Sequence, residues 1–253
     1  WETMRSWNIG FDLGMLNNRL TVSFDWFNRK TINMVGPAPE LPVTLGANVP
    51  KMNNADMQST GFELDLGWRD RIKDFDYGVH LLLSDDRQKI LKYPNTTGKI
   101  NTWYVGKYNG DIWGFETIGI AKSQEEMDAH LASLPNGGQD ALGVKWGAGD
   151  IMYRDLNGDG KISDGATLND PGDKKVIGNT SPRFRFGLDL NASWKGIDVR
   201  LFFQGVAKRD AWLNDNMFWG ATGGIWQSAC FTSHLDFFRE EGDDFWSANK
   251  DAY

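Results

Sequence analysis

The chain has 253 residues, with 27 Lys and Arg against 34 Asp and Glu and a formal net charge of -7. This acidic balance argues against a nucleic-acid-binding protein, because phosphate neutralisation needs clustered Lys and Arg. The single cysteine, Cys230, excludes an internal disulfide and a thiolate metal cluster. The sequence has no apolar run of about eighteen residues, so no helix is expected to cross a membrane. A tilted β-strand, however, crosses with only ~9–11 residues, half of them polar.

Three pairs of segments alternate apolar and polar residues with a period of two, which predicts antiparallel β-strands. The pairs fall at about residues 6–27, 60–84 and 183–205. Asn17-Asn18 and Lys195-Gly196 have the residue types of tight turns, since Asn and Gly tolerate positive φ. Each strand is expected to have ~10 residues, which suits a tilted membrane span better than the ~5–6-residue strands of a soluble sandwich.

The alternation gives each predicted strand one apolar side and one polar side. The apolar set is expected to face lipid: Leu20, Val22, Phe24, Leu64, Leu66, Leu188 and Leu201. The polar set is expected to face the lumen or plug of a barrel: Asp12, Asp25, Glu63, Asp65, Asp189, Asp198 and Arg200. The same pattern also fits a soluble sandwich that uses the apolar side as its core.

The connections between the pairs are long, at residues 28–59, 85–182 and 206–253. Short turns at one end and long loops at the other are typical of an outer-membrane β-barrel. Six strands are fewer than the roughly eight of the smallest such barrels, and an open sheet leaves backbone groups unsatisfied in lipid. Either the loops contain further strands or the barrel's other strands lie outside this chain, and the second is favoured. The fold class is therefore expected to be all-β, an antiparallel transmembrane β-barrel with long extracellular loops.

One helix is expected inside the second connection. Ser123 and Glu126 have the spacing of a capping box. Met127, Leu131 and Leu134 follow as a one-sided apolar stripe, and Pro135 ends the helix. The expected role of this helix is to pack the loop.

The segment DLNGDGKIS, Asp155 to Ser163, matches the start of a calcium-binding loop, with oxygen donors at alternate positions and a glycine at the sharp turn. The candidate ligands are Asp155, Asn157, Asp159, Lys161 through its carbonyl, Ser163 and Asp164. Position 12 of the loop is Ala166, where a bidentate carboxylate belongs, so Asp164, Asp170 or Asp173 would have to fold back. A tight turn without metal is the alternative. A bound Ca²⁺ is expected to stiffen the loop.

The sequence lacks G-x-S-x-G, H-E-x-x-H and a glycine-rich phosphate loop, so no catalytic residue and no enzyme activity are expected. Tryptophans in the long connections are candidate ligand-binding residues, because exposed aromatic rings stack on sugars. They are Trp103, Trp113, Trp146, Trp219 and Trp226. Packing of the loops is the alternative role.

Several stretches resemble the SusC/RagA family of TonB-dependent outer-membrane transporters. They are SWNIGFDLGMLNNRLTVSFDWFNRKT, NADMQSTGFELDLGW, IWGFETIGIAKSQEEMD, GDIMYRDLNGDGKISD and KKVIGNTSPRFRFGLDLNASWKGIDVRLFFQG. The resemblance implies a large barrel of ~22 strands with a plugged lumen. Residues 1–253 would be part of one C-terminal barrel domain, with the N-terminal plug and the last strands absent. Ala166 departs from the family, which usually has an acidic residue there.

The resemblance also implies a function: TonB-dependent import of glycans or peptides across the outer membrane of Bacteroidetes. The implied partners are a SusD-like surface lipoprotein, outer-membrane lipid, and the TonB complex through the absent N-terminal part. A secreted soluble β-sandwich that binds carbohydrate through its loop tryptophans is the alternative function. A structural outer-membrane or surface-layer barrel without transport is a third.

Overall fold

The computed structural model of the chain describes residues 1–37, 50–213, 231–239 and 248–249. The chain divides into two compact units. The first comprises Trp1–Asp111 and Gly178–Asp210, and the second comprises Ile112–Ile177 and Ala211–Tyr253. The strand pairs predicted from the sequence all lie in the first unit.

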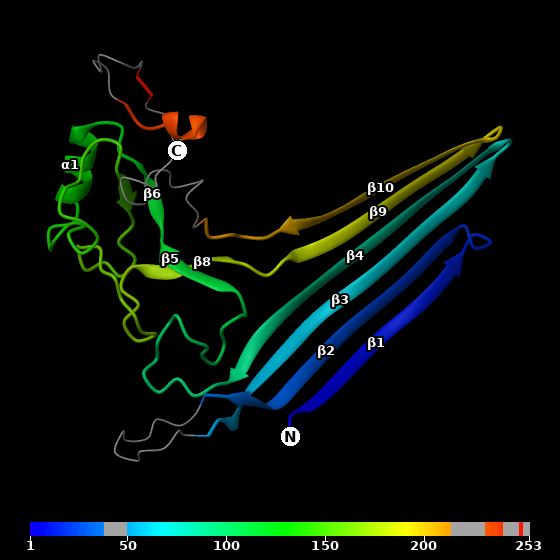
Figure 1. Cartoon of the computed structure of the whole chain (residues 1–253), viewed down its shortest axis with the longest axis horizontal. Coiled ribbons are helices and arrows are strands. Elements are labelled where there is room, and N and C mark those ends of the chain that lie inside the picture. Colours follow the sequence, from blue (N-terminus) through cyan, green and yellow to red (C-terminus); the bar gives the residue numbers. More distant parts are fainter. Residues whose placement is uncertain (38–49, 214–230, 240–247, 250–253) are drawn as a thin grey trace. The chain divides into compact units, whose positions relative to one another are not determined.

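The first unit contains one antiparallel sheet of six long strands in the order β1-β2-β3-β4-β9-β10 (Figure 1). The strands are β1 Thr3–Met15, β2 Leu20–Gly36, β3 Met52–Ile72, β4 Phe75–Lys92, β9 Arg183–Trp194 and β10 Ile197–Lys208. The predicted number of strands and their pairing into three hairpins are confirmed. The structure adds that β4 pairs directly with β9, across the long second connection.

Tight turns close the three hairpins at the same end of the sheet (Figure 1). Asn17 and Asn18 have φ angles of 58° and 62°, and Lys195 and Gly196 have 48° and 85°. These left-handed conformations match the right-handed twist of the flanking strands. We call this end of the strands the turn end and the opposite end the loop end.

The register places every residue of the predicted lipid set on one side of the sheet. Phe11, Phe24, Leu64, Leu83 and Phe186 form one continuous cross-strand row, and Leu13, Val22, Leu66, Leu81 and Leu188 form the next. We call this apolar side the outer face and the polar side the inner face. The predicted lumen set lies entirely on the inner face, because a strand alternates its side chains between the two sides.

The outer face is exposed rather than packed. Trp7 is 75% exposed, Ile9 66% and Leu201 50%, and no side chain in the two apolar rows is buried. The first unit is a single layer with no second sheet of its own, whereas a sandwich packs two sheets face to face. This arrangement contradicts the soluble-sandwich alternative.

The strands extend beyond the predicted segments. Residues 28–36 and 52–59, expected in the first long loop, belong to β2 and β3, and β3 continues through residues 69–72, where the apolar alternation has already ended. The alternation of apolar residues therefore covers only part of each strand.

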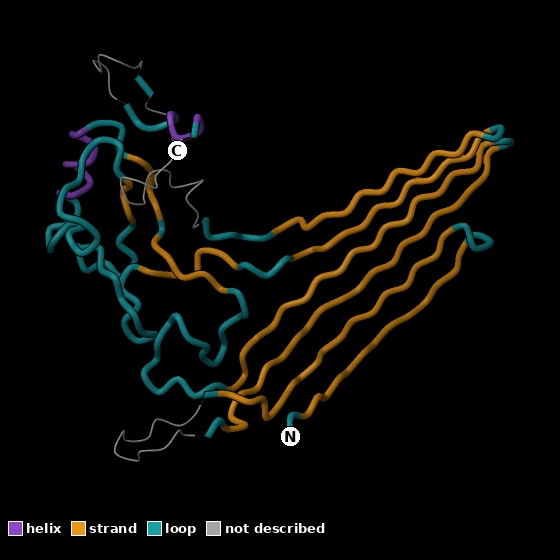
Figure 2. Tube along the Cα trace, viewed as in Figure 1, coloured by secondary structure: helices purple, strands orange, loops and turns teal. Residues whose placement is uncertain are grey.

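The second unit consists mainly of loops and turns around short elements (Figure 2). β5 Asp111–Phe115 pairs with β8 Lys174–Asn179, and β6 Thr117–Ile120 pairs with β7 Ile151–Tyr153. The remaining elements are α1 Gln124–Ala132 and a 3-10 turn, η2 Thr232–Leu235. The small core consists of Ala121, Met127 and Met152, with Leu131 and Trp146 packed against it.

The predicted helix is confirmed as α1. Ser123 is its N-cap and its Oγ accepts the backbone N–H of Glu126 at 3.3 Å, while Glu126 accepts the N–H of Lys122 at 2.7 Å. These bonds satisfy donors that the first turn of a helix leaves free. Met127 is fully buried, so the helix packs the loop as expected. Among the described residues, no helix has the length and apolar character to cross a membrane.

The opposite faces of β4 allow a matched test of the lipid assignment. Leu81 lies on the outer face and its neighbour Leu82 on the inner face. In the full-length protein, Leu81→Arg should destabilise membrane assembly by about 2–4 kcal/mol, the cost of a mid-bilayer cation, whereas Leu82→Arg should be tolerated. Folding into lipid vesicles, measured by denaturant titration, distinguishes them. Equal destabilisation by both substitutions would contradict the assignment.

Candidate functional site

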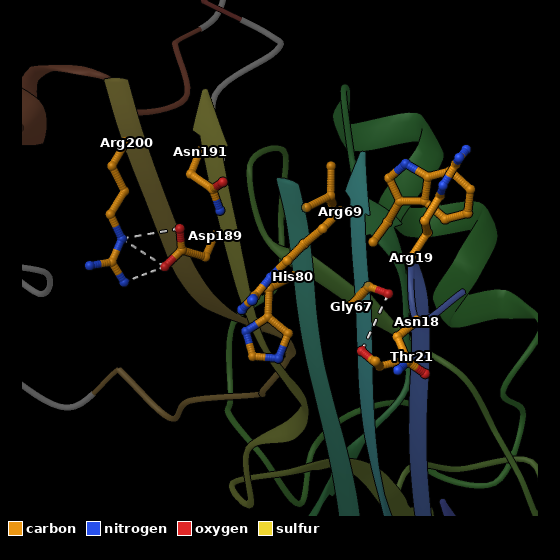
Figure 3. Close-up of a pocket in the computed structure, with 11 residues that line it drawn as sticks. Asn18, Arg19, Thr21, Gly67, Arg69, His80, Asp189, Asn191 and Arg200 are labelled. Carbon is orange, nitrogen blue, oxygen red and sulfur yellow. Dashed lines mark hydrogen bonds and ion pairs between the residues drawn. The ribbon is translucent and has the colours of Figure 1, made fainter. Parts of the chain in front are cut away.

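The inner face carries the polar groups of the sheet and is the candidate functional surface. Near the turn end it forms a pocket of about 530 Å³ (Figure 3). Its lining comes from the β1–β2 turn and from β2, β3, β4, β9 and β10, and includes Arg19, Thr21, Arg69, His80, Asp189, Asn191 and Arg200. Five strands far apart in the sequence thus combine hydrogen-bond donors and acceptors in one place.

Two pairs of hydrogen-bonded side chains lie in or beside this pocket. The Nε of Arg200 donates to both carboxylate oxygens of Asp189, at 2.9 and 3.1 Å (Figure 3). His80 Nε2 lies 2.6 Å from Asp65 Oδ1. Each pair joins neighbouring strands, which holds the polar side chains in place on the sheet. Arg69 forms no ion pair with any described residue, so its charge is available to a ligand or another part of the protein.

A second pocket, of about 490 Å³, lies further along the inner face. It contains Asp25 and Glu63, which are directly opposite each other across β2 and β3, and Asp65 next to them. Directly opposed like charges destabilise a sheet. Neither Asp25 nor Glu63 has an ion-pair partner within the described part of the chain. This pocket is therefore suited to cationic or hydrogen-bond-donating groups.

Two apolar side chains, Leu82 and Phe202, lie on the inner face, at positions that alternate with outer-face residues. Leu82 is 44% exposed and Phe202 is 58% exposed, and both line the acidic pocket. They give the polar surface a local apolar contact area.

The predicted calcium loop is closed by its own backbone. The two carboxylate oxygens of Asp155 accept the N–H groups of Gly158 at 2.6 Å and Gly160 at 2.8 Å. Asn157 accepts the N–H of Asp159 at 2.9 Å, and Asp159 accepts that of Lys161 at 3.1 Å. Burial raises the pKa of Asp155, but the N–H groups around it outweigh that effect and hold the pKa below its usual range.

Asp173 completes this loop. It is fully buried and accepts the N–H of Leu156 at 2.8 Å and of Ser163 at 2.7 Å. Of the three aspartates considered for closing the loop, Asp173 therefore reaches it, whereas Asp164 forms an ion pair with Lys174.

The metal itself stays a prediction. Ca²⁺ takes six to eight oxygen ligands, and many of the candidate side-chain oxygens here accept backbone hydrogen bonds. Over residues 1–37, 50–213, 231–239 and 248–249, no three or more His, Cys, Asp or Glu side chains gather as a metal site.

The candidate ligand-binding tryptophans are dispersed. Trp146 packs against the core of the second unit, donates its Nε1–H to Gly143 at 3.1 Å and contacts the ring of Tyr153 edge-on. Trp103 contacts the ring of Tyr93, with 5.5 Å between ring centroids. Trp113 lies in β5, while Trp219 and Trp226 lie outside the described residues. The contacts of Trp146 and Trp103 favour a packing role, and ligand binding by the set stays a prediction.

The fold and its two-sided sheet can be compared with known proteins. The family model described as "TonB dependent receptor-like, beta-barrel" matches residues 1–226. The chain belongs to this family. It is therefore part of an outer-membrane β-barrel, and the fold class predicted from the sequence is confirmed.

The relatives agree with this membership. TonB-dependent receptor P26 of Formosa agariphila is 29% identical over 218 residues, which cover 81% of this chain and 20% of that protein. TonB-dependent receptor P3 of the same organism is 26% identical, with the same coverage. TonB-dependent receptor SusC of Bacteroides thetaiotaomicron is 25% identical, covering 78% of this chain and 18% of SusC. The chain thus spans about a fifth of the length of these curated relatives.

Solved structures show the same fold. A chain in the structure of the RagAB peptide transporter superposes with a TM-score of 0.64 and 22% identity, covering all of this chain and 25% of that one. Another, in the "closed-closed" state of the RagAB peptide importer, gives a TM-score of 0.61 and 23% identity over 93% of this chain. The predicted resemblance to the SusC/RagA family is confirmed.

The role of Asp173 in the loop can be tested in the full-length protein. Asp173→Ala removes a buried charged acceptor from two backbone N–H groups, which typically costs about 1–3 kcal/mol. We expect faster amide hydrogen exchange across residues 155–173. Asp170→Ala is the matched control, because the Asp170 side chain is exposed and forms no hydrogen bond or ion pair with the described residues of the loop. Equal exchange rates in the two variants would contradict the role of Asp173.

The calcium prediction has a separate test. If Ca²⁺ stiffens the loop, a chelator should speed exchange in residues 155–164 of the full-length protein at neutral pH, and added Ca²⁺ should reverse it. Equal amide exchange rates with chelator and with Ca²⁺ would show that hydrogen bonds alone close the loop. The contribution of the Asp155 carboxylate is present above its ordinary pKa and lost as the pH falls through its lowered one. Because Ca²⁺ binding needs the same ionised carboxylate, the comparison is made at neutral pH, where the chelator alone separates the two effects.

Proposed function

We propose that the chain forms part of the barrel of a TonB-dependent importer of nutrients across the outer membrane. The observation that carries this proposal is the two-faced sheet in a chain that belongs to the family. The apolar outer face suits lipid, and the polar inner face suits an aqueous or protein-filled lumen.

The inner face supports a role in contacting what passes through or fills the barrel. Its two pockets offer charged groups that no described residue neutralises, among them Arg69, Asp25 and Glu63. A plug or substrate that supplies opposite charges and hydrogen bonds would remove the repulsion between Asp25 and Glu63. A substrate that binds this surface through polar contacts can also be released from it.

The proposed cargo is a glycan or a peptide. Among the similar proteins, one is named SusC and another is described as a peptide transporter. Both cargo classes carry many hydrogen-bonding groups, which match the amide, hydroxyl and carboxylate side chains of the inner face. We further propose that a SusD-like surface lipoprotein covers the loop end and that the TonB complex supplies the energy. Neither proposal gives the chain a catalytic role.

Uptake by whole cells tests this function. Deleting the gene and restoring it in full length should abolish and then recover growth on one nutrient class, either oligosaccharides or peptides, when each is the limiting source. A restored strain without its TonB complex should fail to grow on that class although the barrel still assembles. Unchanged uptake of both classes after deletion would favour a structural barrel without transport.

A further inference from the structure

A band of cationic residues crosses the outer face just above the apolar rows, toward the loop end. In the register, Arg5 pairs with Lys30, Lys30 with Gln58, and Gln58 with Lys89. The adjacent row toward the turn end contains Trp7, Asn28, Thr60 and Arg87. Residues directly opposite one another share a face, so Arg5, Lys30, Arg87 and Lys89 all lie on the side that faces lipid. We call these four residues the basic band.

Tyr108, from the connection that follows β4, lies beside the basic band at the edge of β4. Tyr108 forms an isolated bridge with Lys89, and flanking backbone bonds from Ile90 to Lys107 and from Asn109 to Gln88 hold it there at 2.8 Å each. Its ring lies 4.6 Å from the guanidinium carbon of Arg87 and 5.7 Å from the ammonium nitrogen of Lys89. The ring thus orders two long cationic side chains through cation–π contacts.

These residues surround a pocket of about 470 Å³. Trp26 and Phe62 line it on the side of the apolar rows, and Gln58, Thr60, Arg87, Lys89 and Tyr108 supply polar groups on the loop side. Asp85 also lines the pocket, with its carboxylate held by the guanidinium of Arg183. The pocket therefore has apolar side chains toward the turn end and two cations, an amide and hydroxyl groups toward the loop end. This is the order in which a membrane lipid presents its acyl chains and its headgroup.

The charges of the basic band are not neutralised within the described chain. None of its four members forms an ion pair with a described carboxylate, although Arg5 and Lys30 stand directly opposite each other. The nearby carboxylate on this face, Asp85, is held by the guanidinium of Arg183. Like charges opposite one another destabilise a sheet unless an anion screens them. Asp85 also attracts Arg87, but this one carboxylate is shared with Arg183, so the band has more positive charge than its neighbours balance.

We propose that the pocket beside Tyr108 binds the phosphate-bearing headgroup of a lipid in the membrane leaflet at the loop end. Arg87 and Lys89 contact the phosphate, Gln58 and Thr60 donate hydrogen bonds, and Trp26 and Phe62 contact the start of the acyl chains. Phosphate bound by two cations is a charge-assisted contact of the strong kind.

The position of the band favours a lipid over a soluble anion. It borders the exposed apolar rows directly, so an anion bound there meets hydrocarbon on one side. The outer face at the turn end is different: its last two rows contain Asp70, Tyr77, Ala192 and Val199, then Ile72, Phe75, Trp194 and Ile197. None of these residues is a cation, and of the cations that approach them Arg19 is paired with Asp70 and Lys195 lies over the ring of Trp194. The asymmetry matches a headgroup of one leaflet. The proposal rests on membership of the barrel family and is independent of the proposed import.

Native mass spectrometry of the full-length protein in detergent tests the site. The probes are phosphorylated lipid A and the same lipid after enzymatic dephosphorylation. We expect Arg87→Gln/Lys89→Gln to bind the phosphorylated lipid about ten-fold more weakly than the wild type, because two charge-assisted contacts are lost. The dephosphorylated lipid should bind both proteins equally. Arg87→Lys/Lys89→Arg keeps both charges and should retain most of the binding.

Lys73→Gln/Lys195→Gln is the matched control, since it removes the same charge from the hairpin turns at the other end of the sheet. It should bind the phosphorylated lipid as the wild type does, and heat-modifiable mobility on gels confirms that each variant forms a barrel. Equal loss in the control, or no loss in Arg87→Gln/Lys89→Gln, would overturn the proposal. Displacement of the lipid by excess inorganic phosphate would overturn the lipid assignment in favour of a free anion.

Discussion

The need to pair every backbone N–H and C=O inside hydrocarbon governs this chain. Within the sheet, β2, β3, β4 and β9 each pair with a strand along both edges, whereas β1 and β10 each pair along one edge only. Their outer edges require further strands before the sheet can lie in lipid, which a closed barrel supplies. Once the backbone is paired in this way, side-chain direction is fixed, and the sequence needs only a period of two to give lipid and lumen different surfaces.

This constraint explains what the sequence predicts and where the prediction ends. Leu20, Val22 and Phe24 alternate clearly with polar residues because one side of β2 meets lipid. Further along the same strand, residues 28–36 carry polar groups on both sides, and the alternation disappears although the pairing continues to Gly36. Hydrophobic alternation reports the contact with lipid rather than the length of the strand. The alternation is likewise missing at residues 69–72 of β3, although these residues still pair with β4.

The sites could not be predicted in the same way, because distant segments build them. Asp173 closes the loop that begins at Asp155, and the motif gives no reason to prefer it over Asp164 or Asp170. Arg183 reaches Asp85, on the outer face, next to Phe184, whose φ of 51° interrupts the regular strand. Tyr108 joins the outer face only because residues 106–109 run along β4 beyond the start of β9. Local spacing carries no signal for such contacts.

Each face has a pair of like charges directly opposite each other on neighbouring strands, and the two pairs differ in sign. On the inner face Asp25 and Glu63 oppose each other, and on the outer face Arg5 and Lys30 do so. Either pair alone would weaken the sheet. A protein or solute in the lumen can bring cations to the first pair, whereas a lipid headgroup can bring only an anion or a dipole to the second. The repulsion within each pair is thus relieved when a lipid headgroup contacts the outer face and a protein or solute contacts the inner face. The stability of the strands therefore depends on the membrane on one side and on the contents of the barrel on the other.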